Sequence, residues 1–237
     1  MDSASRLDAL GAPAELVSWA TGRPARRAWR DCPQADWLLW LAAAESLPVT
    51  TLVLAAGTCV ERAVTALPSG AEPLGRALRA ARSLEAADCA AAARACEAAR
   101  ESFPESYRAG RNPGYGAAAH AAAWVARAAE GVVTARARAE AKRGERAREL
   151  AAIVGSSPDI FVPATPSPPE ALDPAAAPGD PVEEELRYAV AAAAQALGEA
   201  AQSLAPDVRE PEAHERAQAE LCEQLRVLLE PLRSIAP

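Results

Sequence analysis

Histidine and cysteine are the side chains of this chain that could serve as general base, nucleophile or metal ligand. The two histidines are His120 and His214. His120 stands four residues before Trp124 in an alanine-rich stretch, so we interpret it as a packed or half-exposed helical histidine. His214 lies in a polar, acidic stretch, and we expect it to face solvent. Nucleophilic catalysis needs a base beside its nucleophile, and neither histidine has a recognisable setting for that role. We therefore predict no catalytic residue.

The five cysteines, Cys32, Cys59, Cys89, Cys96 and Cys222, are odd in number and scattered, with no C-x-x-C pair. This pattern is typical of reduced thiols that pack as small apolar side chains. Cys89 and Cys96 share a helical face but lie two turns apart, about 10.5 Å along the axis, which is too far for one metal ion. No Walker loop, dinucleotide fingerprint or H-E-x-x-H pattern occurs. We predict neither a metal nor a cofactor.

A loop between residues 104 and 116 combines aromatic, guanidinium and amide side chains of the kinds that anchor protein interfaces. Its members are Tyr107, Arg108, Arg111, Asn112 and Tyr115. They are our candidates for partner binding. The alternative is a loop that folds back on the bundle.

The elements that must position these residues are predicted to be helices. Alanine, leucine, arginine and glutamate dominate the chain, and these residues lose little entropy on entering a helix. Prolines and glycines divide residues 1–154 into about eight helical segments. Pro13 and Pro24 stand where a first-turn proline is tolerated, while Gly11 and Gly22 stand where a helix can close with a left-handed residue. The fold class is therefore predicted to be all-α, a multi-helix bundle.

The apolar spacing of the segment after Pro33 predicts a central helix. Trp37, Trp40, Leu41 and Ala44 stand at i, i+3, i+4 and i+7, so they share one face. We expect the first three of them in the core. Thr50 is the predicted N-cap of the next helix. A long segment from 117 to 154 follows later, with a bend or break expected at its two internal glycines, at positions 131 and 144.

Residues 155–181 contain eight prolines, and we interpret them as an extended linker between the bundle at 1–154 and a helical hairpin at 182–237. The apolar triplet at 160–162 is expected to dock the linker onto the bundle. Leu221, Leu225, Leu228 and Leu232 are the predicted apolar stripe of the last helix. Two isolated helices bury too little area to be stable alone, so we expect the hairpin to pack on the bundle.

Charge and the N-terminal residues limit the partners and the compartment. The formal net charge is −7, from 25 basic and 32 acidic residues, which argues against nucleic acid as the main partner. The first residues lack a basic region followed by an apolar run, and no stretch has the ~20 continuous apolar residues of a membrane span. We expect a cytoplasmic protein that does not bind membranes.

A short motif early in the chain resembles a known family. Trp29 and Cys32 form W-x-x-C, and the run ADWLLWL at 35–41 follows closely. This combination is similar to a family of immunity proteins, small helical domains associated with bacterial polymorphic toxin systems. The similarity continues through the segment EPLGRALRAARSL to about residue 130, so it covers roughly half of the chain. The linker and the last two helices have no counterpart. No catalytic residue of the family can be transferred.

The resemblance implies a protein that binds another protein, such as a toxin encoded nearby. Together with the lack of a catalytic motif, it makes a non-catalytic, immunity-like or adaptor protein our first hypothesis. A small-ligand sensor is the alternative, because tryptophans around a helical bundle can line an apolar pocket. An uncharacterised enzyme is a third hypothesis.

Overall fold

Helices are the only regular elements in the part of the chain that the computed structural model describes, which is residues 3–67, 71–102, 114–154, 172, 179–206 and 210–233. This confirms the predicted all-α fold. The helices are α1 (Ser3–Ala9), α2 (Ala14–Ala20), α3 (Ala25–Asp31), α4 (Ala35–Ala44), α5 (Val49–Thr65), α6 (Glu72–Ala81), α7 (Ala86–Glu101), α9 (Tyr115–Val154), α10 (Pro181–Leu204) and α11 (Pro211–Arg233).

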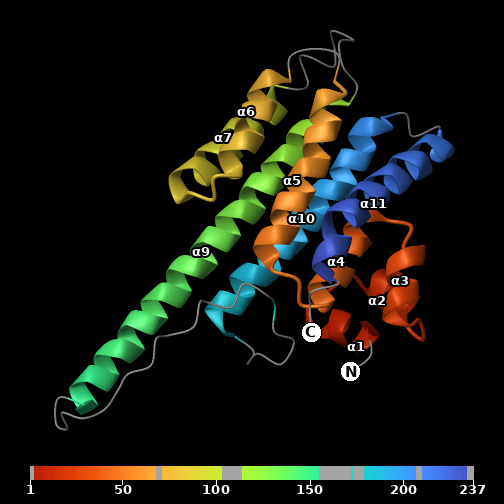
Figure 1. Ribbon diagram of the computed structural model, residues 1–237. Helices are drawn as coiled ribbons and strands as arrows, with labels where there is room; N and C mark the ends of the chain where they lie inside the picture. The colour runs from red at the N-terminus through yellow and green to blue at the C-terminus, as the bar shows by residue number, and fades with distance from the viewer. Residues whose placement is uncertain are drawn as a thin grey trace.

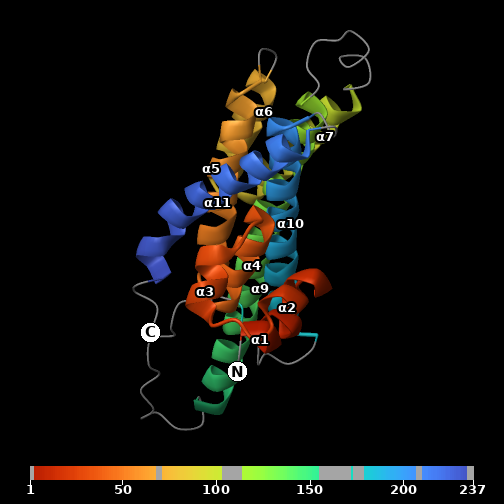
Figure 2. The same ribbon diagram turned by 90° about the vertical axis from the view of Figure 1, so that its right-hand side faces the viewer.

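The middle of the bundle is formed by α10, which contacts α9, α5, α4 and α11. Figure 1 shows the short helices α1–α4 gathered at one end of the bundle, and α6 and α7 against the first half of α9 at the other. In Figure 2, α11 crosses the bundle obliquely. A segment near the C-terminus thus lies against α4 and α5, which come from the first third of the chain.

Small side chains allow α9 and α10 to pack closely. Ala128, Ala189 and Ala193 are fully buried between the helices of the core. A Cβ atom at Gly131 would lie only 3.3 Å from the Cβ of Ala189 and from the carbonyl oxygen of Glu185. The absence of a side chain at Gly131 therefore allows the close approach of the two helices. The break that we expected at residue 131 or 144 is absent, since α9 runs for 40 residues from Tyr115 to Val154. Packing on α10 compensates for the weak helix propensity of the glycine.

The turns between the first helices follow the predicted glycines. Gly11 and Gly22 have φ values of +77° and +73°. The expected N-cap at Thr50 is wrong, because α5 already begins at Val49 after Pro48. The Thr50 hydroxyl instead accepts a hydrogen bond of 2.9 Å from Arg136 of α9. Proline fixes the backbone before a helix without offering a capping oxygen, so the helix can start two residues earlier than the hydroxyl pattern indicates.

The buried face of α11 differs from the predicted stripe. Leu221 and Leu225 are fully buried, but Leu228 and Leu232 are 37% and 38% exposed, and Leu229 is buried in their place. The predicted spacing follows the 3.5-residue repeat of a helix paired with one partner along its length. Because α11 instead crosses α4, α5 and α10, its buried residues follow steps of four.

Within the described ranges, no helix is long and apolar enough to cross a membrane.

Candidate binding pocket between α3 and α11

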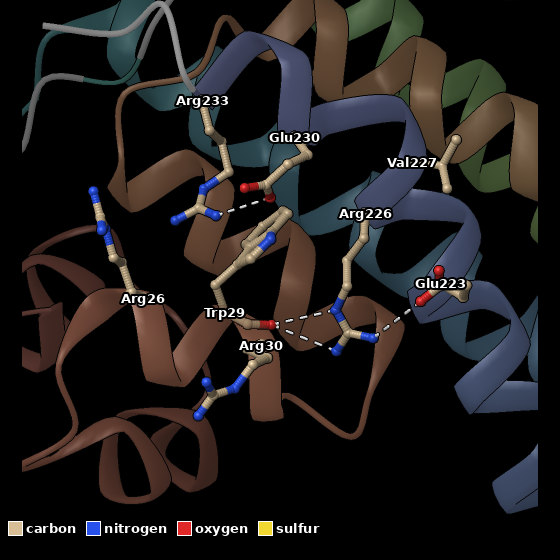
Figure 3. A pocket seen from close by; sticks show the side chains of 8 residues that line it. All are labelled: Arg26, Trp29, Arg30, Glu223, Arg226, Val227, Glu230 and Arg233. Atoms are coloured by element: carbon tan, nitrogen blue, oxygen red, sulfur yellow. Dashed lines mark hydrogen bonds and ion pairs between the residues drawn. The ribbon is translucent and has the colours of Figure 1, made fainter.

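A cavity of about 660 Å³ opens where α3 meets the last three turns of α11 (Figure 3). Four arginines, two glutamates, one tryptophan and one valine line it: Arg26, Trp29, Arg30, Glu223, Arg226, Val227, Glu230 and Arg233. The first three come from α3 and the other five from α11, so the cavity exists only because the two ends of the chain meet.

Trp29 lies among the four arginines of the pocket, two of which come from α3 and two from α11 (Figure 3). Its side chain is only 4% exposed, and its indole nitrogen Nε1 is buried with no hydrogen-bond partner among the described residues. The guanidinium carbon of Arg233 lies 4.2 Å from the centre of its ring. This distance is typical of a cation–π contact, which holds the ring in place from one side.

Arg233 is held in position by two carboxylates. Its Nε and Nη2 atoms donate to Glu45 at 2.5 and 2.7 Å, and its Nη1 donates to Glu230 at 3.1 Å. Burial lowers the pKa of Arg233, but the hydrogen bonds and charges of Glu45 and Glu230 raise it by more. The pKa of Arg233 is therefore above its ordinary value. The side chain is 11% exposed. Arg233 is thus a fixed positive charge in the wall of the pocket.

Arg226 is held by the end of α3. Its Nη2 donates to the carbonyl of Cys32 at 2.9 Å, and Nε and Nη2 donate to the carbonyl of Trp29 at 3.4 Å. These carbonyls lie where a helix leaves its last acceptors unpaired, so a guanidinium there stabilises the helix end. Arg226 therefore joins α11 to α3.

Arg26 and Arg30 stand one turn apart on the outer face of α3, and both are exposed. Arg30 is 75% exposed in its side chain and pairs with Asp31 at 2.9 Å. Arg26 makes no hydrogen bond or ion pair with the described residues. The lining carries four positive and two negative charges, an excess of positive charge in a chain whose net charge is −7.

Of the W-x-x-C and ADWLLWL motif, Trp29 lines this pocket, and the carbonyl group of Cys32 accepts a hydrogen bond from the lining residue Arg226. Trp29, Cys32, Trp40 and Leu41 are buried, each 3–4% exposed. Trp37 is only partly buried and lies 5.7 Å from Trp19, measured between ring centres. Its place in the core is therefore at the edge, although it shares the helical face that we identified.

Most of the predicted partner-binding loop lies outside the described residues: Tyr107, Arg108, Arg111 and Asn112 fall in the gap at 103–113. Tyr115 is the first residue of α9 and is partly buried against the core. The apolar triplet at 160–162 also lies outside the described ranges. Leu172, from the same proline-rich segment, is 2% exposed and belongs to the core. The apolar spacing of the sequence does not indicate this residue.

A second polar cluster surrounds His120, at the contact of α9 with α10. His120 Nδ1 lies 3.0 Å from a carboxylate oxygen of Glu199, and Trp124 Nε1 donates to His120 Nε2 at 3.0 Å. Arg127 stacks on Trp124 and pairs with Glu97 of α7. Both ring nitrogens of the histidine are therefore occupied, and the cluster connects α7, α9 and α10.

His214 is partly buried, which corrects our expectation that it faces solvent. It lies near Asp36, where burial raises the pKa of the carboxyl group and backbone hydrogen bonds from Trp37 and Asp36 partly offset that rise. Among the residues that the structure describes, no group of three or more histidine, cysteine or acidic side chains could hold a metal ion.

All five cysteines are free and buried, as predicted. Burial raises the pKa of Cys32, Cys59 and Cys96 to about 12 and that of Cys89 and Cys222 to about 11. Their thiols fill the core as small apolar groups.

Comparisons of the chain with protein-family models, with curated proteins and with solved structures found no match. The geometry of the chain itself therefore carries the functional argument.

Proposed function

We propose that this chain is a non-catalytic binding protein that attaches to another protein through the face formed by α3 and α11. The observation that carries the proposal is the pocket itself. Arginine and tryptophan are enriched among the residues that contribute most to protein interfaces, and here four arginines surround a tryptophan in a cavity of about 660 Å³.

One exposed apolar side chain of α11 belongs to the same face. Of the five large apolar residues that are exposed in the described ranges, three lie on this helix, but Leu228 and Leu232 do not line the pocket. Val227 is 67% exposed and lines the pocket. Exposed apolar groups beside charged groups are typical of surfaces that bind proteins.

The proposal includes the wider setting that the W-x-x-C and ADWLLWL motif implies. In that setting, the chain is an immunity-like or adaptor protein in the bacterial cytoplasm, and its partner is a toxin encoded nearby. The motif and the pocket are connected, because the carbonyl groups of Trp29 and Cys32 accept hydrogen bonds from Arg226 of α11.

The test is a binding measurement by calorimetry between the full chain and the protein encoded next to it. Val227→Asp should abolish binding, because it places a charge in the apolar part of the contact. The matched control is Leu150→Asp, at a residue that is 48% exposed near the end of α9. Loss of binding in both variants, or in neither, would contradict the proposed face.

A small-ligand sensor is the second candidate, favoured by the size of the cavity, which falls in the range that small molecules occupy. If so, a metabolite extract passed over the immobilised chain should yield one small molecule that changes the tryptophan fluorescence. That change should disappear in Trp29→Phe and persist in Trp124→Phe.

A further inference from the structure

We infer that the partner presents an acidic peptide segment to this pocket, and that Arg26 and Arg30 are the residues that bind its carboxylates. This inference rests on the proposed function and names the chemistry of the partner. The four arginines of the pocket separate into two that are engaged within the chain and two that are available.

The engaged pair is Arg226 and Arg233. Arg226 donates to two backbone carbonyls, and Arg233 donates to Glu45 and Glu230 and stacks on Trp29. Their side chains are 24% and 11% exposed. Binding an external anion through them would break contacts that hold α11 against α3 and α4. These two arginines set the shape of the pocket.

The available pair is Arg26 and Arg30. Arg26 makes no ion pair or hydrogen bond within the described chain, and Arg30 is bound only to Asp31, in a pair whose side chains are 75% and 35% exposed. An exposed pair of this kind contributes little to stability, so a carboxylate of the partner can replace Asp31 at little cost. Guanidinium groups bind carboxylates with two parallel hydrogen bonds.

The spacing of the pair suits an extended acidic peptide. Arg26 and Arg30 stand four residues apart on the helix, about 6 Å along its axis. Side chains at positions i and i+2 of an extended peptide point the same way and are about 6.8 Å apart, which flexible arginine side chains can span. An apolar residue of the same peptide would then contact Val227, across the pocket from α3.

The two glutamates of the lining explain why a peptide is favoured over a compact anion. Glu223 and Glu230 stand on the α11 side of the cavity. They repel an anion that enters deeply, whereas carboxylates held at the α3 side keep away from them. Inorganic phosphate carries its whole charge in one place and so cannot combine contact with both arginines and contact with Val227.

The experiment uses the full chain and a fluorescein-labelled ten-residue peptide of alternating glutamate and leucine, with binding followed by fluorescence anisotropy at low salt. The companion peptide has glutamine in place of each glutamate. The acidic peptide should bind, the neutral one should not, and binding should weaken as salt rises. Inorganic phosphate at equal ionic strength should not displace the peptide.

The decisive variant is Arg26→Gln with Arg30→Gln, which should weaken peptide binding about tenfold or more, because the charged hydrogen bonds to the peptide carboxylates are lost. The matched control is Arg76→Gln with Arg79→Gln, at two exposed arginines of α6. This control has the same net charge as the decisive variant. Both variants change exposed side chains, and a thermal melt checks that each stays folded.

Three results would overturn the inference: no binding of the acidic peptide up to about 1 mM, equal weakening in both arginine variants, or equal displacement by phosphate. The proposed function fails separately. If Val227→Asp abolishes binding of the neighbour-encoded protein while Arg26→Gln with Arg30→Gln leaves it unchanged, the face is right and the acidic segment is wrong.

Discussion

Arg233 shows how single side chains hold the two ends of this chain together. Its guanidinium group lies over the ring of Trp29 and also donates two hydrogen bonds to Glu45. The planar face of the group makes the first contact, and its two N–H donors make the second. Lysine has neither a planar face nor a fork of N–H donors. Because the carboxylate of Glu45 is 25% exposed, removal of Arg233 would leave a poorly hydrated charge without its partner.

We predict that Arg233→Ala lowers the free energy of unfolding by about 2–3 kcal/mol, because it removes a mostly buried charge partner and uncovers Trp29. Urea denaturation measures this change. Arg76→Ala, at an exposed arginine of α6, should change stability by less than about 0.5 kcal/mol. Equal effects of the two substitutions would show that the contact of Arg233 with Glu45 and Trp29 contributes nothing.

The buried thiols make stability depend on alkaline pH. Burial raises the pKa of each thiol to about 11 or 12, while the unfolded chain releases the same protons near pH 8.5. The folded state therefore binds more protons above that pH, and the thiol contribution to stability is full below it. It falls by about 1.4 kcal/mol per pH unit for each thiol until the folded thiols ionise.

Urea midpoints at pH 7.5 and pH 10 test this prediction, and the midpoint should be lower at pH 10. A variant with Cys32, Cys59 and Cys222 all replaced by alanine should lose less stability over the same pH range. If the variant and the parent chain respond alike, groups other than these thiols cause the effect. The native thiols should also react slowly with a bulky maleimide at pH 7.5 and rapidly in denaturant.

At the scale of the element, Gly131 and Gly144 of α9 form a natural matched pair. We predict that Gly131→Ala destabilises the protein, because its new Cβ would lie 3.3 Å from backbone and Cβ atoms of α10 that cannot move separately. Gly144→Ala should instead stabilise it by about 0.5–1 kcal/mol, since the nearest neighbour is the flexible end of Arg148 at 4.0 Å. Thermal melts of the two variants should shift in opposite directions, and a shift in the same direction would contradict close packing at Gly131.

The same helix shows what the sequence could predict. Apolar spacing identified the helices and the burial of Trp40 and Leu41, because both are set by short-range periodicity. It failed at Gly131, where the deciding neighbours lie about 55 residues later, in α10. It also failed at the pocket, because Trp29 and Arg233 are about 200 residues apart and no local pattern links them. Long-range contacts of this kind leave no period in the sequence.

At the scale of the molecule, the central position of α10 joins both ends of the chain into one packing unit. The helix is alanine-rich, and its buried positions face α9, α5, α4 and α11 in turn. Without α10, the apolar faces of three helices from the first 154 residues would be open to water. This cost is proportional to the area uncovered, about 25 cal/mol for each Å².

We therefore predict that residues 1–154 alone do not form the native bundle. The fragment should show weaker helical circular dichroism per residue than the full chain and a broad melt, whereas the full chain should unfold in one cooperative transition. Ala193→Asp in the full chain is the matching variant, because this alanine is fully buried in the centre of α10 and an unpaired carboxylate there should destabilise the whole bundle. A fragment that melts sharply at the temperature of the full chain would show instead that α10 and α11 are additions to a bundle that folds without them.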